Sequence, residues 1–226
     1  MSATATALRG PRADGRPLLR GLLHAAVLPV AFAGGLLLWQ TTSGSVARQA
    51  SVAVFAATLV GLYAVSSAYH LGPWSARFRR LMARADAAMI QLFIAGTFTP
   101  VAFHTLDGSW RTWSLAVAWV VAIGGALIAA SPLQAPRWIT TAGFLATGWL
   151  AVVPLTQIVQ ALPWEGVGLI TLGGALYTIG ALVYARRWPD PFPAWFGYHE
   201  VFHLFVVAAS TAHYVAIWQY VLPGGA

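Results

Sequence analysis

Seven long apolar runs account for most of this chain, and they limit how it can fold more than any other feature. They cover residues 19–40, 47–70, 86–105, 110–130, 137–160, 165–185 and 196–221. A helix of about 20–25 residues matches the roughly 30 Å hydrocarbon core of a bilayer. Strands are excluded because the runs are too long and lack the alternation of apolar and polar residues. The sequence therefore predicts an all-α fold: a polytopic membrane protein with a bundle of seven transmembrane helices.

The low charge content agrees with a membrane protein. Only 8% of the 226 residues are charged and 58% are hydrophobic, whereas soluble domains carry about 25% charged residues. The formal charge of +7 reflects 13 arginines, since the chain has no lysine. These arginines lie at the ends of the apolar runs, which favours a role in membrane orientation and argues against nucleic acid as a partner.

The arginines are divided unequally between alternate connections. Two, Arg48 and Arg111, fall on one side of the membrane. Eleven fall on the other: Arg9, Arg12, Arg16, Arg20, Arg77, Arg79, Arg80, Arg84, Arg137, Arg186 and Arg187. An excess of positive charge marks the cytoplasmic side, so we expect a cytoplasmic N-terminus and, after seven crossings, a C-terminus outside. Residues 1–18 are expected to form a disordered or surface-lying cytoplasmic tail, and residues 19–226 one domain in the cytoplasmic (inner) membrane.

Two histidines four residues apart lie in the last apolar run. His199 and His203 share one face of a helix, which is the spacing that two nitrogens need to bind one metal ion. Ionisable groups at membrane depth are costly, so a cluster of them indicates a functional site. The expected topology brings further polar residues to the same depth: Ser66 and His70 near the end of the second helix, and Asp86 in the first turn of the third.

These residue types fit a catalytic zinc site. The chain has no cysteine, so histidine and carboxylate are the available ligands. Three neutral imidazoles, from His70, His199 and His203, leave a fourth position for water, whose pKa zinc lowers to about 7. Asp86 could orient that water or take its proton, and Ser66 could hold the water or donate to an oxyanion. Two other interpretations stay open: Ser66 as a packing hydroxyl, and Asp86 as a partner of the helix dipole or of an arginine.

A second motif overlaps the histidine pair. The segment His199-Glu200-Val201-Phe202-His203 matches the H-E-x-x-H of zinc proteases, in which the glutamate is the general base. An intramembrane protease needs a further ligand, for which Asp107 in Leu106-Asp107-Gly108 is a candidate. Asp107 follows Asp86 by 21 residues, about 32 Å along a helix. We therefore expect it at the opposite membrane face, which argues against a protease.

We expect structural roles for the other three histidines. His104 falls at the outer end of the third helix, and His24 has no evident partner in the first. His213 is ten residues past His203, about 15 Å along the helix and too far to bind the same ion. A buried hydrogen bond is its expected role.

Three local patterns resemble those of the hemolysin III family. They are Ser66-Ser67-Ala68-Tyr69-His70, Ile94-Ala95-Gly96-Thr97-Phe98-Thr99-Pro100 and Gly197-Tyr198-His199-Glu200-Val201-Phe202-His203-Leu204. That family comprises the bacterial members of the progestin and adiponectin receptor (PAQR) family, within a superfamily of proposed membrane hydrolases that includes alkaline ceramidases. The likeness covers nearly the whole chain from the first helix on.

The resemblance implies a seven-helix bundle with a zinc site on the cytoplasmic side. His70, His199 and His203 match the zinc ligands, and Asp86 and Ser66 match the groups around the zinc-bound water. The chain departs from the pattern at Ala87, where many members carry a histidine, and this could alter hydrogen bonding around the ligands.

Two functions remain open from the sequence. The first is a membrane-embedded, zinc-dependent hydrolase that acts on an amide or ester bond of a lipid at the cytoplasmic leaflet. The second is a non-enzymatic sensor, channel-like protein or membrane-homeostasis protein with a structural zinc site. A membrane lipid would be the substrate in the first case and a ligand in the second.

Overall fold

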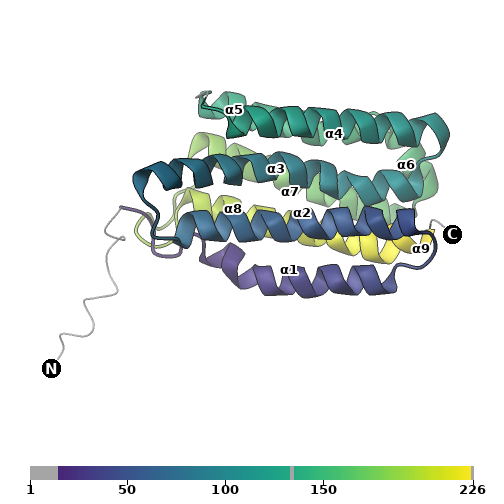
Figure 1. Cartoon of the computed structure of the whole chain (residues 1–226), viewed down its shortest axis with the longest axis horizontal. Coiled ribbons are helices and arrows are strands. Elements are labelled where there is room, and N and C mark those ends of the chain that lie inside the picture. The colour runs from purple at the N-terminus through teal and green to yellow at the C-terminus, as the bar shows by residue number, and fades with distance from the viewer. Residues whose placement is uncertain (1–14, 133–134, 225–226) are drawn as a thin grey trace.

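The structure, a computed structural model, describes residues 15–132 and 135–224, and arranges them as helices lying side by side (Figure 1). The helices are α1 (Leu22–Thr41), α2 (Val46–Leu71), α3 (Ala76–Thr105), α4 (Gly108–Ala130), α5 (Arg137–Trp149), α6 (Leu155–Ala161), α7 (Trp164–Arg186), α8 (Tyr198–Ala216) and α9 (Leu222–Gly224). A 3-10 turn (Leu150–Val152) follows α5, and a π-helical turn (Ile217–Val221) follows α8. Within the described ranges the chain forms no strand, only an isolated bridge between Phe192 and Phe196. The predicted all-α class is confirmed.

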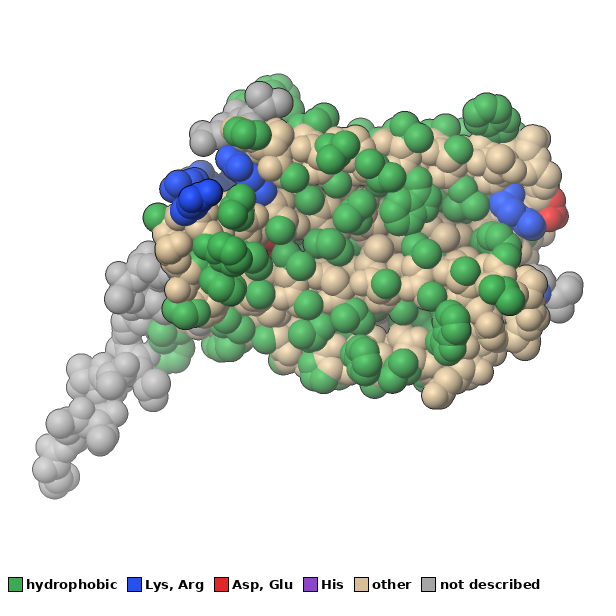
Figure 2. All heavy atoms as spheres, in the orientation of Figure 1, with side chains coloured by type: hydrophobic (Ala, Val, Ile, Leu, Met, Phe, Trp, Pro, Cys, Tyr) green, Lys and Arg blue, Asp and Glu red, His purple; other side chains and the backbone are tan. Residues whose placement is uncertain are grey.

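In the described part of the chain, six helices are long and apolar enough to cross a membrane: α1, α2, α3, α4, α7, and α8 with its π-helical turn. The segments Arg137–Val152 and Leu155–Ala161 are bent by 54° and give a seventh span if they cross together. Large apolar side chains cover the outside of the bundle (Figure 2); Trp113 and Val120, for example, are each 70% exposed. A surface this apolar is stable against hydrocarbon rather than water, so the chain is a multi-pass membrane protein.

Helix α3 is longer than predicted. It begins at Ala76, ten residues before the expected start at residue 86. Ser75 caps it by accepting a hydrogen bond from the backbone N–H of Phe78. The placement of Asp86 in the first turn was therefore wrong, because Asp86 lies about three turns into α3.

The helix expected over residues 137–160 is interrupted. Helix α5 ends at Trp149, and the 3-10 turn extends this part to Val152. Helix α6 begins directly after Pro154, and the two parts are inclined by 54°. Proline has no backbone N–H to donate and its ring clashes with the preceding turn, which accounts for a break at this position.

The bundle has two ends that differ in charge. We call the end where α1, α3 and α8 begin the basic end, and the end where α2 and α4 begin the far end (Figure 1). The described chain starts at the basic end and stops, after α9, at the far end (Figure 1). Arg48 and Arg111 belong to the far end. Nine arginines belong to the basic end: Arg16, Arg20, Arg77, Arg79, Arg80, Arg84, Arg137, Arg186 and Arg187. Arg9 and Arg12 lie outside the described residues.

The segment before α1 packs against the loop before α8. The backbone N–H groups of Leu18 and Leu19 donate to the carbonyls of Ala194 and Trp195, at 3.1 Å each. Pro17 is buried. The end of the predicted tail thus lies on the surface of the bundle, while residues 1–14 are outside the described part of the chain.

Helices α2 and α3 approach closely at the centre of the bundle. A Cβ atom added at Gly96 would lie 2.8 Å from the Cβ of Thr58, a distance that only glycine at this position allows. Phe55 and Phe93 are buried on the two sides of this contact. The approach sets the spacing between the helices that carry Ser66 and His70 on one side and Asp86 on the other.

Candidate metal centre

Three predicted ligands meet at the basic end of the bundle. His70 lies in the last turn of α2, and His199 and His203 lie in the first two turns of α8. One ring nitrogen from each histidine lies within 4.8 Å of the other two. The Nε2 atoms of His70 and His199 are 3.2 Å apart. His70 and His203 are buried and His199 is half-buried.

One pair of the three rings has the nitrogen spacing of a shared metal ion. Two nitrogens bound to one tetrahedral zinc ion at roughly 2.0–2.1 Å are about 3.3–3.4 Å apart, close to the 3.2 Å between His70 and His199. The ring planes are inclined to one another by 57–81°, so the imidazoles meet edge-on rather than as a stack. Three imidazoles, two buried and one half-buried, are nitrogen ligands of the kind that zinc prefers.

Asp86 and Ser66 lie beside the three histidines. The Oδ2 atom of Asp86 is 3.9 Å from Nε2 of His70, which is too long for a hydrogen bond. The hydroxyl of Ser66 lies beside the Asp86 carboxylate and favours its charged form. Ser66 is one turn before His70 in α2 and is buried. All five residues predicted for the site therefore belong to one cluster.

A fourth histidine packs on this cluster, although the sequence analysis gave it no partner. His24, in the first turn of α1, stacks on His203 with ring centroids 3.9 Å apart and planes inclined by 10°. The ring of Tyr63 meets His24 edge-on at 5.0 Å. The first helix was expected to start on the same side as the last, so the sequence could have placed His24 at the depth of His199 and His203. The face of the helix on which His24 lies could not be inferred.

Glu200 of the H-E-x-x-H segment is engaged in other contacts. It is 1% exposed; Oε2 accepts a hydrogen bond of 2.8 Å from the N–H of Gly197, and Oε1 pairs with Nε of Arg20. Both oxygens are thus used to cap α8 and to link it to the start of α1. Asp107 lies at the far end, where it pairs with Arg111 at 2.8 Å. Neither carboxylate is placed for a protease.

Arg137 of α5 holds the start of α8 in place. It donates to the Tyr198 hydroxyl at 3.1 Å and to the Tyr184 carbonyl at 3.3 Å, with its guanidinium over the Tyr184 ring. The Tyr184 ring in turn lies 5.8 Å from that of His199. Asp190 accepts a hydrogen bond of 2.8 Å from the backbone N–H of Tyr198. These contacts, which sequence reasoning missed, fix the first turn of α8 and with it His199.

The remaining two histidines have the expected structural contacts. His104 lies at the far end, with Nε2 3.2 Å from the hydroxyl of Ser51. Nδ1 of His213 is 3.0 Å from the carbonyl of Ala209, and the side chain is buried. The predicted buried hydrogen bond of His213 is confirmed.

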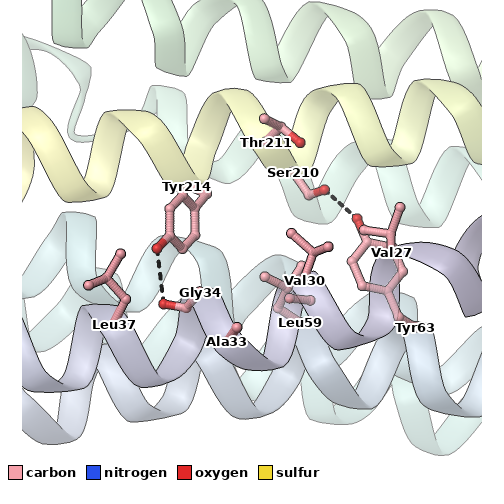
Figure 3. A pocket seen from close by; sticks show the side chains of 11 residues that line it. Val27, Val30, Ala33, Gly34, Leu37, Leu59, Tyr63, Ser210, Thr211 and Tyr214 are labelled. Carbon is pink, nitrogen blue, oxygen red and sulfur yellow. Dashed lines mark hydrogen bonds between the residues drawn. The ribbon is translucent and has the colours of Figure 1, made fainter.

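An apolar cavity of about 340 Å³ lies between α1, α2 and α8 (Figure 3). Two tyrosines frame it: Tyr63 bonds to the Ser210 hydroxyl at 2.6 Å, and Tyr214 donates to the Gly34 carbonyl at 3.0 Å (Figure 3). Tyr63 also touches His24. The rings of Tyr63 and His24 thus lie between the cavity and the histidine cluster.

Comparisons with known proteins agree with the sequence patterns. The family model described as "Haemolysin-III related" matches residues 15–214. The chain is 29% identical to Hemolysin-3 of Bacillus cereus over 189 residues, which cover 83% of each protein. It is 23% identical to the monocyte to macrophage differentiation factor of Homo sapiens over 201 residues, covering 87% of this chain and 81% of that protein. It is 30% identical to the adiponectin receptor protein of Drosophila melanogaster over 185 residues, covering 73% of this chain and 41% of that protein. The chain belongs to the haemolysin-III-related family, and members of the PAQR family are among its relatives.

Proposed function

We propose that the protein is a zinc-dependent membrane hydrolase that cleaves an amide or ester bond of a lipid at the cytoplasmic leaflet. The observation that carries this proposal is the approach of three imidazole nitrogens to within 4.8 Å of one another beside a carboxylate. Structural zinc sites are usually closed by four protein ligands, whereas three histidines are typical of catalytic sites with an open position. Asp86 supplies no fourth bond in this arrangement and remains free to act on a reactant.

His70, His199 and His203 would hold the ion as neutral imidazoles. When bound, zinc supplies Lewis acidity and lowers the pKa of a water to about 7. The Asp86 carboxylate accepts a proton from the attacking water, as a general base. The Ser66 hydroxyl favours the charged form of that carboxylate, and in this proposal it donates to the carboxylate and orients it towards the histidines. Holding the water or donating to the oxyanion is the other role proposed for Ser66.

The cavity between α1, α2 and α8 supports a lipid as the substrate. Its volume of about 340 Å³ is roughly eleven times the 30 Å³ that one water occupies in the liquid, which is room for part of an acyl chain. Its walls are mainly Val, Leu, Ala and aromatic side chains, which favour a hydrocarbon. Tyr63 and His24 lie between this cavity and the cluster, so an acyl chain there would have its polar end near the site.

The decisive experiment combines metal analysis with substitution of Asp86. Purified protein should contain about one zinc ion per chain, and His70→Ala should lose it. Asp86→Ala should keep the zinc and the melting temperature, yet hydrolyse acyl-lipid or ceramide-like substrates about 100-fold more slowly, as expected for loss of a general base. Folded, zinc-loaded wild type that cleaves none of these substrates would falsify the hydrolase proposal.

A structural metal site is the second candidate, favoured by the tight packing around the ligands. His24 covers one face of His203, and Arg137 and Tyr184 hold the turn that carries His199. In that case His70→Ala should lower the melting temperature strongly, and Asp86→Ala should change neither stability nor any cellular activity by much. The same two variants therefore separate the two functions.

A further inference from the structure

We propose that the start of α3 is a docking surface for the phosphate-bearing headgroups of anionic membrane lipids. The surface consists of Arg77, Arg80 and Arg84, which we call the α3 arginine face. The proposal goes beyond the hydrolase function and is independent of it, since the surface does not include the histidine cluster.

The three arginines lie on one face of a helix. Residues at i, i+3 and i+7 are neighbours along a helix surface, and the distance from Arg77 to Arg84 along the axis is about 10.5 Å. Asp86 follows Arg77 by nine residues, about two and a half turns, and therefore lies on the opposite side of α3. The α3 arginine face thus points away from the candidate metal centre. Figure 2 shows basic side chains gathered at this end of the molecule.

No carboxylate of the described residues neutralises these arginines. Among the described residues, the arginines of the α3 arginine face form no ion pair and no hydrogen bond through their side chains. Other arginines do: Arg20 pairs with Glu200, and Arg111 pairs with Asp107. Three guanidinium groups within about 10 Å repel one another unless anions lie between them. No carboxylate of the described residues compensates this charge, so the surface can accept an anion from outside the bundle.

Apolar side chains beside the arginines indicate a lipid as the source of that charge. Phe78 and Leu81 are 44% and 48% exposed, and the ring of Trp74 packs on Phe78 at 4.8 Å. A helix that combines arginines with exposed large apolar side chains lies at the boundary between headgroups and acyl chains. Basic clusters next to a membrane span recognise anionic lipids there. A soluble polyanion would leave Phe78 and Leu81 without a partner.

The arginines of the α3 arginine face are also aligned, which membrane orientation does not require. Orientation depends on how many arginines a short connection carries, not on their spacing. Here the segment is helical from Ala76, and three of its four arginines, all but Arg79, are aligned. Alignment matters for binding several phosphates at once, because guanidinium groups bind phosphate oxygens in a fixed geometry.

The test compares Arg80→Gln/Arg84→Gln with the matched control Arg186→Gln/Arg187→Gln, which removes the same charge at the same end of the bundle. Binding of phosphatidylglycerol and of phosphatidylcholine with identical acyl chains is measured by native mass spectrometry in a neutral detergent. Near an anionic surface each arginine contributes about fivefold in affinity. Wild type should prefer phosphatidylglycerol, the α3 variant should lose roughly 25-fold of that affinity, and the control pair should stay within about threefold of wild type.

Two results would overturn the proposal. One is equal affinity of the wild type for the two lipids. The other is an equal loss in the two variants, which would show a general charge effect instead of a site. Thermal unfolding checks that both variants are folded, and the single variant Arg80→Gln, at an exposed position, replaces the double one if it is not. No turnover is measured, so failure here leaves the hydrolase proposal standing.

Discussion

At the residue scale, the stack of His24 on His203 is the contact that most restricts the geometry of the candidate ligands. The rings are nearly parallel at 3.9 Å, and both side chains are buried. A flat neighbour at this distance prevents the His203 ring from turning about its own bond to Cβ. His24 thereby helps to direct a nitrogen of His203 towards His70 and His199, as a positioning residue.

Removal of the His24 ring should weaken metal binding. His24→Ala leaves His203 free to rotate, and we expect about a tenfold lower zinc affinity, as is common when a group that orients a ligand is lost. His24→Phe is the matched control, because it keeps a flat ring and should retain most of the affinity. Competition with a chromophoric chelator measures both. Unchanged affinity in His24→Ala would show that the stack does not position His203.

The gathering of the five proposed site residues at one end could be predicted because depth in the membrane follows from residue number and topology. Each residue advances 1.5 Å along its helix, so Ser66, His70, Asp86, His199 and His203 could be placed in one leaflet. Rotation of a helix about its axis is set by packing against neighbours, which residue number does not contain. For this reason the stack of His24 and the ion pair between Arg20 and Glu200 were not found.

At the element scale, α8 begins in a network that joins it to the start of α1. Glu200, which is buried, caps the helix and pairs with the partly buried Arg20. The loss of one partner from a buried ion pair leaves a charge without compensation, which is far more costly than the pair is stabilising.

Glu200→Ala should therefore destabilise the protein by roughly 3–5 kcal/mol. Glu165→Ala is the control, because Glu165 is an exposed residue in the first turn of α7, and it should cost about 1 kcal/mol or less. Reversible unfolding in mixed micelles measures the difference. A protease base would behave in the opposite way: Glu200→Gln would abolish activity and leave stability unchanged.

The close contact between α2 and α3 gives a second prediction for the elements. Gly96→Ala places a Cβ against Thr58, and overpacking of this kind costs typically 1–3 kcal/mol. The helices should separate slightly and move Asp86 away from His70, so zinc affinity or activity should fall along with stability. Gly124→Ala in α4 is the control, because a Cβ added there meets no neighbouring atom within 4 Å. It should be neutral or stabilising. Equal behaviour of the two variants would argue against tight packing at Gly96.

The apolar runs predicted which segments form long helices better than they predicted where each helix begins and ends. The apolar run of the third span begins only after Arg84. Arginine is nevertheless a good helix former, so α3 already starts at Ala76 and includes the arginines before that run. Proline was a poor guide in the other direction. Pro29 and Pro100 lie inside α1 and α3, whereas the chain breaks at Pro154. Whether neighbours satisfy the backbone groups that a proline frees depends on tertiary packing.

At the scale of the whole molecule, the described arginines are divided nine to two between the basic end and the far end. The first described residue and the last lie at opposite ends (Figure 1). The seven-crossing arrangement with a cytoplasmic basic end follows if the bent pair α5 and α6 crosses as one span.

Reporter fusions should place the C-terminus outside the cytoplasm. Green fluorescent protein fused there should be dark, alkaline phosphatase fused there should be active, and a fusion after Arg187 should give the reverse pattern. The physical basis is the preference of arginine-rich connections for the cytoplasmic side. A fluorescent C-terminal fusion would mean that α5 and α6 form a re-entrant hairpin and that only six helices cross.

The histidine cluster joins parts of the chain that are far apart in sequence. His70 and His199 are separated by 129 positions, with α3 to α7 between them. An ion held by both would act as a cross-link that closes most of the bundle, and cross-links that close long loops restrict the unfolded chain most. Since α8 is synthesised after α2 to α7, such a cross-link could form only once all of these helices have been made and correctly inserted. The metal content of a preparation would then report the fraction of chains that contain an inserted α8. A chain truncated before α8 would lack His199 and His203 and would bind no metal at this site.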